Sequence, residues 1–187
     1  MNASQSVFLV GLPGSGKSTV GRQLSRRLGL PFVDSDQVIE QRIGSSIRAF
    51  FDREGEEAFR DLESQVIDEV TGGPLAVVAT GGGAVLRPEN RACLHDRGRV
   101  VYLRSTPEDL ARRLRNDRHR PLLQVADPLV RLKDLYAQRH PLYAETAHFA
   151  IDTGRPSVAT LVNMILMQLE LAGWVANVPQ HDPPPTS

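Results

Sequence analysis

The residues most able to do chemistry lie near the start of the chain. Residues 11–19 read Gly-Leu-Pro-Gly-Ser-Gly-Lys-Ser-Thr, which contains the complete P-loop pattern G-x-x-x-x-G-K-[ST]. Such a turn directs backbone N–H groups at phosphate oxygens, while the lysine reaches the β- and γ-phosphates and the serine hydroxyl can hold Mg²⁺. The sequence therefore predicts nucleotide binding here. The expected contacts are Gly14, Ser15, Gly16, Lys17, Ser18 and Thr19.

Two carboxylates follow a short strand-like segment at 31–34, in the run Asp34-Ser35-Asp36. Alternation along a strand places both carboxylates on the same side of the strand end. Ligands of open α/β sheets bind beyond the carboxyl ends of the strands, so one acid could hold Mg²⁺ through water and the other could orient an acceptor hydroxyl. The alternative is that one of them only caps a helix beginning near Gln37.

An arginine and a run of glycines are further candidates for an acceptor site. Arg60 lies beside the apolar stripe of a helix expected over 54–70, and arginine grips a carboxylate with two parallel bonds. The alternative is a surface arginine paired with a neighbouring glutamate, either Glu56, Glu57 or Glu63.

The third apolar strand runs into Thr80-Gly81-Gly82-Gly83, which presents bare backbone at the same sheet edge. Its N–H groups could meet a γ-phosphate or a small substrate, or the glycines could form only a permissive turn. Many P-loop proteins carry an acid at this position, and none is present here. Asp34 or Asp36 must therefore supply the acidic part of a metal site.

Residues 115–126 are polar, basic and without clear periodicity, and they lie between two capped helices. This composition predicts a mobile lid that closes over phosphates with an arginine. The alternative is a solvated loop whose arginines pair with Asp117 and Glu108. Another arginine, Arg139, follows at the end of the next expected helix.

The elements that must position these residues alternate between strands and helices. Apolar runs predict strands at 6–10, 31–34, 75–79, 99–103 and 148–152. Helix start signals occur at Thr106-Pro107, at Asp127-Pro128 and at Pro156, and the helix after the P-loop presents Val20, Leu24 and Leu28 on one face. We predict an α/β fold with a parallel sheet covered on both faces.

Size and charge restrict the class of protein. A chain of 187 residues, with 22 acidic and 22 basic residues, fits one domain without a bulk field for nucleic acid or membrane. Lone Cys93 excludes an internal disulfide, and residues 1–6 lack the features of a signal peptide, so a cytoplasmic protein is expected. The expected domain covers residues 1–172, with the acceptor region at about 36–62. A flexible proline-rich tail is expected over 173–187.

Taken together, the motifs resemble those of the shikimate kinase family over about residues 6–170. The P-loop at 11–19 and Asp34-Ser35-Asp36 carry this resemblance. It continues in Glu40-Gln41-Arg42-Ile43-Gly44, Phe50-Phe51, Gly55-Glu56-Glu57-Ala58-Phe59-Arg60, Gly81-Gly82-Gly83, Arg120-Pro121-Leu122-Leu123 and Arg139-His140-Pro141-Leu142-Tyr143.

The resemblance implies a three-layer P-loop kinase fold with five parallel strands in the order 2-3-1-4-5, helices on both faces, and a lid. It implies transfer of the γ-phosphoryl group of ATP to the 3-hydroxyl of shikimate, with one Mg²⁺ per subunit. The products would be shikimate 3-phosphate and ADP, on the pathway to chorismate and the aromatic amino acids. The expected enzyme is a cytoplasmic monomer with no nucleic-acid or membrane partner.

The resemblance also implies roles for individual residues. Lys17, Asp36 and Arg120 would be catalytic, with Asp36 binding the shikimate hydroxyls and Arg120 reaching the phosphates from the lid. Ser18 would bind Mg²⁺ directly and Asp34 through water. The shikimate contacts would be Asp36, Arg60, Gly81, Gly82 and Arg139. Arg113 and Arg155, with Pro156, would lie on the adenine side.

Two other functions remain as alternatives. One is a small-molecule kinase of the same architecture, such as a gluconate kinase, from which the combination of Asp36, Arg60, the glycines and Arg139 would distinguish this chain. The other is a non-catalytic nucleotide-binding regulator, for which the second aspartate and the lid arginines would be superfluous.

Overall fold

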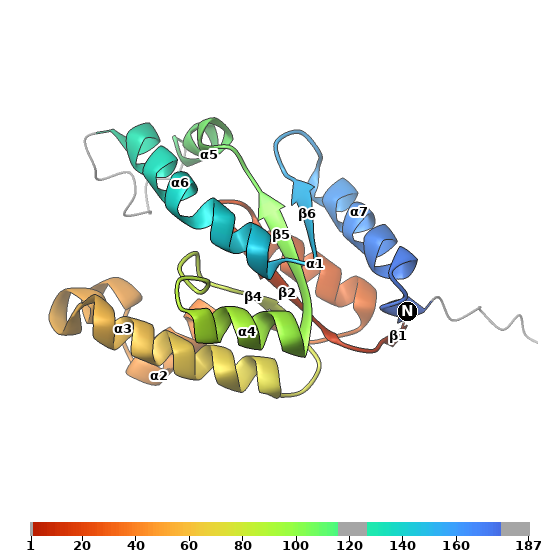
Figure 1. Cartoon of the computed structure of the whole chain (residues 1–187), viewed down its shortest axis with the longest axis horizontal. Coiled ribbons are helices and arrows are strands. Elements are labelled where there is room, and N and C mark those ends of the chain that lie inside the picture. Colours follow the sequence, from red (N-terminus) through yellow and green to blue (C-terminus); the bar gives the residue numbers. More distant parts are fainter. Residues whose placement is uncertain (1, 116–126, 177–187) are drawn as a thin grey trace, which may run out of the picture.

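The computed structural model describes residues 2–115 and 127–176 (Figure 1). Its centre is a sheet of five parallel strands in the order β3-β4-β2-β5-β6. The strands are β2 (Ser6–Val10), β3 (Phe32–Asp34), β4 (Val77–Ala79), β5 (Gly98–Arg104) and β6 (Phe149–Asp152). The expected strands and the expected order 2-3-1-4-5 are confirmed. β2 is central and fully buried, as its continuous apolar run predicts.

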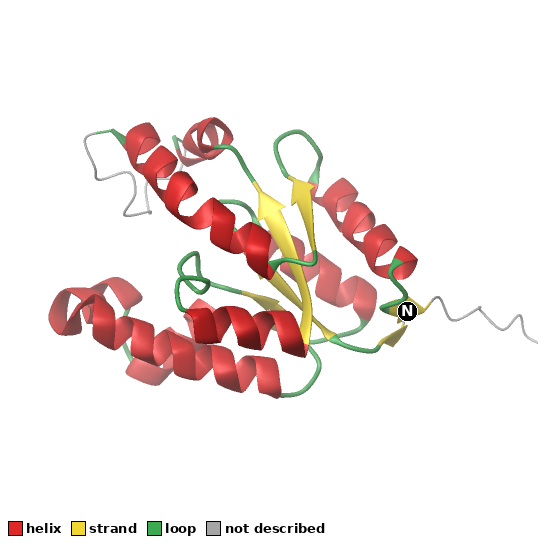
Figure 2. Cartoon of the chain, viewed as in Figure 1, coloured by secondary structure: helices red, strands yellow, loops and turns green. Residues whose placement is uncertain are grey.

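Helices cover both faces of this sheet and make three layers (Figure 2). Val7 and Leu9 of β2 pack in one core cluster with α1 (Lys17–Leu28) and α7 (Val158–Leu171). Phe8 and Val10 point to the other face, where the covering helices are α3 (Ile47–Gly72), α4 (Pro88–Arg97), α5 (Pro107–Leu114) and α6 (Pro128–Thr146). The period-2 alternation of a strand thus divides one apolar run between two cores. The short helix α2 (Ser35–Ile43) packs on α3.

Two of the predicted helix starts are confirmed by their caps, whereas the last helix begins at Val158 with Ser157 as its cap and not at Pro156. The side chain of Thr106 accepts a hydrogen bond from the Asp109 N–H, and Asp127 caps α6 in the same way. Two further features differ from expectation. α4 was not predicted, and α3 begins at Ile47 rather than near residue 54, with a break at Gly55, where φ is 86°. Glycine permits this left-handed conformation, so α3 consists of a first helical segment before Gly55 and the expected helix after it.

The expected domain boundary at residue 172 is wrong. β7 (Val175–Ala176) pairs antiparallel with β1 (Asn2–Ala3) in a small second sheet, and Val175 is buried. The packed domain therefore extends to Ala176, because the buried side chain of Val175 holds β7 against β1. The remainder of the expected tail, 177–187, lies outside the described residues.

Two further sequence expectations concern bilayers and thiols. In the ranges 2–115 and 127–176, no helix combines the length and apolarity needed to cross a bilayer. Cys93 is a free, half-buried thiol.

A histidine links the sheet to the helices at the end opposite the P-loop. His148 accepts a hydrogen bond at Nδ1 from the Val100 N–H, at 2.9 Å, and stacks on His95 with ring centroids 4.3 Å apart. Burial, with a smaller contribution from His95, lowers the pKa of His148 to about 4. The neutral ring is therefore the form that the fold requires, because a protonated Nδ1 cannot accept the Val100 bond.

We expect His148 to make the stability of the fold fall in acid. Since the folded protein binds this proton more weakly than the unfolded chain does, its stability should fall as the pH drops from about 6.5 to about 4. His148→Asn keeps an acceptor oxygen near the Nδ1 position but cannot titrate. The free energy of unfolding of the two proteins, measured in urea, should differ by a constant above pH 7 and should shift in favour of the variant below pH 6.5. Parallel curves down to pH 4 would contradict this role.

Candidate active site

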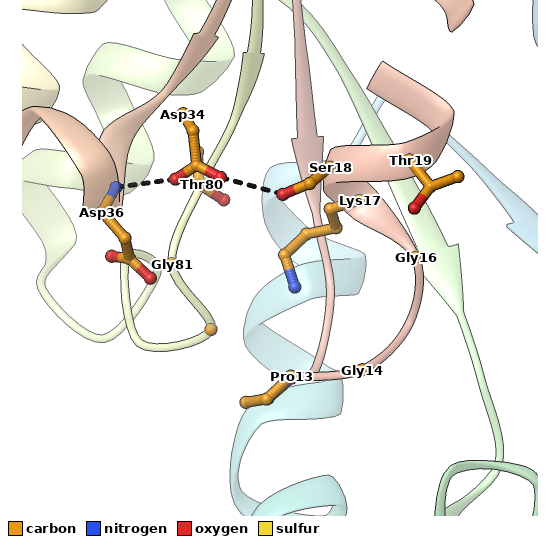
Figure 3. Close-up of a pocket in the computed structure, with 11 residues that line it drawn as sticks. Pro13, Gly14, Gly16, Lys17, Ser18, Thr19, Asp34, Asp36, Thr80 and Gly81 are labelled. Carbon is orange, nitrogen blue, oxygen red and sulfur yellow. Dashed lines mark hydrogen bonds between the residues drawn. The ribbon is translucent and has the colours of Figure 1, made fainter. Parts of the chain in front are cut away.

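The carboxyl ends of three neighbouring strands surround one cavity of about 300 Å³ (Figure 3). The P-loop follows β2, the two aspartates follow β3, and the glycines follow β4. This is the sheet edge at which α/β proteins bind ligands. The lining residues are Pro13, Gly14, Gly16, Lys17, Ser18, Thr19, Asp34, Asp36, Thr80, Gly81 and Gly82.

The P-loop half of the cavity is shaped for an anion. Gly16 is the N-cap of α1 with φ 93°, and no side chain caps the helix, so its first N–H groups and the positive end of its dipole face the loop. Lys17 Nζ donates to the carbonyl oxygens of Gly11, at 2.7 Å, and Leu12, at 2.9 Å. Figure 3 shows its side chain directed into the space between the P-loop and Asp36. The ammonium group is thus held beside the loop that the sequence assigns to phosphates.

Asp34 caps a helix, as one of the sequence alternatives predicted, and it also contacts the P-loop serine. Its Oδ1 caps α2 by accepting from the N–H groups of Asp36, at 3.0 Å, and Gln37, at 3.3 Å. Its Oδ2 accepts from the Ser18 hydroxyl at 2.8 Å. One carboxylate therefore joins the start of α2 to the start of α1, with a hydroxyl and a carboxylate oxygen side by side.

This pair of oxygens fits Mg²⁺, which prefers hard oxygen ligands and takes few of them from protein when phosphates are present. Within the described part of the chain, no group of three or more Asp, Glu, His or Cys side chains could hold a metal on its own. A metal at Ser18 and Asp34 would therefore complete its shell with water and phosphate oxygens.

The glycine loop, residues 80–83, lets three polar side chains approach bare backbone. A Cβ atom added at Gly81 would lie 2.5 Å from Asp36 Oδ1, and one at Gly83 would lie 2.6 Å from Arg60 Cζ. A Cβ at Gly82 would meet Pro13 at 2.8 Å and Arg139 Nη1 at 3.3 Å. The structure thus brings together Asp36, Arg60 and Arg139, which are far apart in the sequence.

Asp36 is held in an environment that opposes its ionisation. Burial, followed by the charge of Asp34, raises the pKa of Asp36 to about 6, although Lys17 acts in the opposite direction. A carboxylate with this pKa is close to the range in which a general base accepts a proton at neutral pH. Strongly shifted titrating groups in a cavity are typical of functional sites.

Arg60 makes the glutamate contact that the sequence left as an alternative, but it is not a surface residue. Its Nη1 donates to Glu63 Oε1 at 2.8 Å, and Glu63 is only 2% exposed. Exposed Glu56 approaches Arg60 Nε at 3.6 Å. Burial raises the pKa of Glu63, and Arg60 and Arg139 oppose that rise. The charges of both guanidinium groups thus act on one buried carboxylate, which Arg60 contacts directly, and the Nε atoms of both arginines lack a hydrogen-bond partner.

A second cavity of about 330 Å³ lies on the other side of the P-loop. It is bounded by Gly14 and Thr19 on one side and by Arg113, Thr153 and Pro156 on the other. Arg113 donates to the Thr153 carbonyl oxygen and, at 3.5 Å, to that of Gly14. Arg113 therefore lies beside the P-loop, and its expected contact with adenine stays a prediction.

Among the predicted site residues that the structure describes, Arg60, Arg139 and Arg155 line neither cavity, and Arg60 and Arg139 instead pack on the glycine loop beside the first one. Arg155 lines a neighbouring cavity with Arg104, Tyr136 and Asp152. Arg120, and the expected lid except its first residue, lie outside the described residues. Sequence reasoning also gave no role to the hydroxyls of Ser35 and Tyr143, which bond the glycine loop. Both stood inside recognised motifs, but no spacing rule indicates what a buried hydroxyl will contact.

Comparison with known proteins adds an independent line of evidence. The family model described as "Shikimate kinase" matches residues 13–170. A shikimate kinase from Paracidovorax citrulli is 64% identical over 171 residues, covering 90% of this chain and 93% of the relative. The structure of an Acinetobacter baumannii shikimate kinase in complex with shikimate has a TM-score of 0.85 at 44% identity, covering 92% of this chain and 96% of that one.

A gluconokinase structure from Sinorhizobium meliloti matches with a TM-score of 0.57 at 18% identity, covering 92% of this chain and 95% of that one. At that identity the likeness concerns the fold alone. The shared fold therefore does not by itself identify the acceptor.

Asp36 should lower the stability of the folded protein at neutral pH. Its raised pKa means that the folded protein holds the proton more tightly than the unfolded chain does, so stability falls as the pH rises from about 4 to about 6. At about 1.4 kcal/mol per pKa unit, the cost above pH 6 is at most about 3 kcal/mol. Asp36→Asn should remove this cost, and urea unfolding should find the variant more stable at pH 8 but not at pH 4.

Asp152→Asn is the matched control, because Asp152 is exposed and its pKa is lowered by its hydrogen bonds to Arg104. It should be no more stable than the wild type at pH 8. Equal stability of Asp36→Asn and the wild type at pH 8 would show that ionisation of Asp36 does not destabilise the folded protein.

Proposed function

The chain belongs to the shikimate kinase family and phosphorylates shikimate with ATP, and we propose that the cavity at the carboxyl ends of β2, β3 and β4 is where it does so. The observation that carries this assignment is the convergence of Asp36, Arg60 and Arg139 on the glycine loop, beside the P-loop. The γ-phosphoryl group of ATP is transferred to the 3-hydroxyl of shikimate, which gives shikimate 3-phosphate and ADP.

Charge supports the placement of the acceptor. Arg60 and Arg139 carry two positive charges against the single buried carboxylate of Glu63, with exposed Glu56 adding a weak, solvent-screened contact. A ligand carboxylate would neutralise the remaining charge, and guanidinium groups bind carboxylates in a fixed, two-bond geometry. We assign the shikimate carboxylate to these two arginines.

Asp36 packs on Gly81, at the other end of the glycine loop from Arg60, and there faces the ring hydroxyls of shikimate. Its carboxylate accepts a hydrogen bond from the reacting hydroxyl and takes its proton, for which a pKa of about 6 is suitable. Gly82 contributes backbone contact to the substrate. The Gly81 N–H is already donated to Ser35 Oγ, so Gly81 acts by its close packing on Asp36 rather than as a donor.

The phosphate half of the site supplies positioning and charge neutralisation, which is most of what phosphoryl transfer requires. Lys17 and the N–H groups at Gly14–Thr19 hold the β- and γ-phosphates. Mg²⁺, bound by Ser18 and through water by Asp34, would offset the charge of the phosphate oxygens. The adenine base of ATP lies in the second cavity, between Arg113 and Pro156. The roles expected for Arg120 and Arg155 stay predictions.

We expect one domain that acts as a cytoplasmic monomer and needs no nucleic acid or membrane. The neutral overall charge fits this expectation, since it provides no field for such partners.

The first test is ADP release in a coupled assay containing ATP and Mg²⁺, with shikimate, with gluconate, or with neither. Turnover should depend on shikimate and be absent with gluconate. Asp36→Asn should bind ADP like the wild type but turn over about 10²- to 10⁴-fold more slowly, since general-base assistance has that size. Equal turnover with gluconate, or full activity of the variant, would contradict the acceptor site.

Gly83→Ala should weaken the acceptor half alone. The added Cβ would displace the Arg60 guanidinium, which is the far end of a flexible side chain, so the fold can adjust while the carboxylate clamp cannot. Loss of one charge-assisted bond predicts a rise of about tenfold or more in the KM for shikimate. The KM for ATP should stay within about twofold.

Gly72→Ala is the control for this substitution. Its Cβ would make ordinary contact with Arg97 Nη1 at 3.5 Å, far from the site in the last turn of α3. Neither KM should change. Equal changes in both KM values for Gly83→Ala would remove Arg60 from the acceptor site.

A further inference from the structure

The glycine loop is held in place by two hydroxyl groups from elements on either side of it. The Gly81 N–H donates to Ser35 Oγ at 3.2 Å, and the Tyr143 hydroxyl donates to the Gly82 carbonyl oxygen. Ser35, at the start of α2, and Tyr143, on α6, are both completely buried. These two bonds fix one amide and one carbonyl group of a segment that has no side chains of its own for this purpose.

Tyr143 also lies beside Arg139, one helical turn earlier on α6, so the two side chains share a helix face. The Arg139 guanidinium interacts with the Tyr143 hydroxyl and lowers its pKa, but burial has the larger effect and raises the pKa of Tyr143 to about 12. The phenol therefore remains a donor throughout the working range of the enzyme. The Gly82 carbonyl and Arg139 thus have one neighbour in common.

A fixed carbonyl constrains more than one atom, because the peptide bond is planar. Orienting the Gly82 carbonyl orients the whole peptide plane between Gly82 and Gly83, and Gly83 is the residue that packs against Arg60. On the other side, Ser35 holds the amide of Gly81, which packs against Asp36. Asp36, Arg60 and Arg139 therefore each pack against backbone that a hydroxyl group orients.

We propose, building on the proposed function, that Tyr143 and Ser35 are positioning residues for the acceptor. Their hydroxyls hold the glycine loop so that Asp36, Arg60 and Arg139 keep the separations that shikimate needs, and neither hydroxyl touches the reacting atoms. Removing either one loosens the loop and weakens acceptor binding, while the nucleotide half of the site is unaffected.

The chain offers a matched control for each hydroxyl. Tyr102 is a second buried tyrosine, with its ring centroid 5.1 Å from that of Tyr143, but its hydroxyl bonds His140 Nδ1 instead of the loop. Ser25 is a second buried serine, whose hydroxyl donates to the Arg22 carbonyl oxygen within α1. A merely structural role would make each member of a pair behave like the other.

The test is steady-state kinetics of Tyr143→Phe, Tyr102→Phe, Ser35→Ala and Ser25→Ala, with shikimate and ATP varied in turn and melting temperatures recorded. Tyr143→Phe and Ser35→Ala should raise the KM for shikimate by about 3- to 10-fold, as loss of a buried neutral hydrogen bond predicts. Their KM for ATP should stay within twofold. Both control variants should keep both KM values, even where their melting temperature falls by a similar amount.

The inference is overturned if Tyr143→Phe matches Tyr102→Phe, and Ser35→Ala matches Ser25→Ala, in the KM for shikimate. Should Tyr143→Phe fail to fold, the serine pair decides the question, because Ser35 bonds the same loop from the other side. Wild-type enzyme without shikimate-dependent turnover would instead overturn the proposed function, and the inference with it. An active wild type with indistinguishable variants would remove the inference alone.

Discussion

The site depends on a missing atom, the Cβ that three consecutive glycines lack. Gly81, Gly82 and Gly83 allow polar side chains from α2, α6 and α3 to pack directly on the backbone that leaves β4. Any side chain on this loop would occupy space that Asp36, Arg139 or Arg60 now fills. Because β4 lies between β2 and β3 in the sheet, this crowding occurs beside the P-loop and not at a distance from it. The sheet order therefore places the glycine loop beside the P-loop, where an acceptor and a phosphate can meet.

Gathering these groups has an electrostatic cost that the rest of the fold must offset. Asp36 is partly buried near Asp34, which raises its pKa. Glu63 is buried, and two guanidinium groups partly offset the resulting rise in its pKa. Burial of charge is tolerated in proteins when partners and hydrogen bonds compensate it, and functional sites are where incomplete compensation is retained. The apolar cores on the two faces of the sheet supply the stability that permits this arrangement. Under the proposed function, the incomplete pairing of the two arginines favours the binding of an anionic acceptor.

Sequence patterns predicted the parts of the structure that depend on neighbours along the chain. The five strands and the P-loop are short, continuous signals, and the caps at Thr106 and Asp127 act within one helical turn. The local alternatives for Asp34 and Arg60 could not be decided, because each residue makes the local contact and the long-range one. The pairing of β1 with β7 was missed since two-residue strands carry no period. The bonds from Ser35 and Tyr143 to the glycine loop were also missed, because buried polar pairing is set by tertiary structure.

The two halves of the site therefore differ in how the chain encodes them. The phosphate half is contiguous, at residues 11–19, and would bind a nucleotide in many proteins of this fold. The acceptor half comes from residues as far apart as Asp36 and Arg139, and its geometry exists only when α2, α3 and α6 meet the glycine loop. A gluconokinase shares the fold at 18% identity, which shows that the shared architecture does not by itself select the acceptor. Under the proposed function, the side chains that the glycines admit and the groups that hold the glycines in place select the acceptor. Changes there should alter which alcohol is phosphorylated without altering how the phosphate donor is bound.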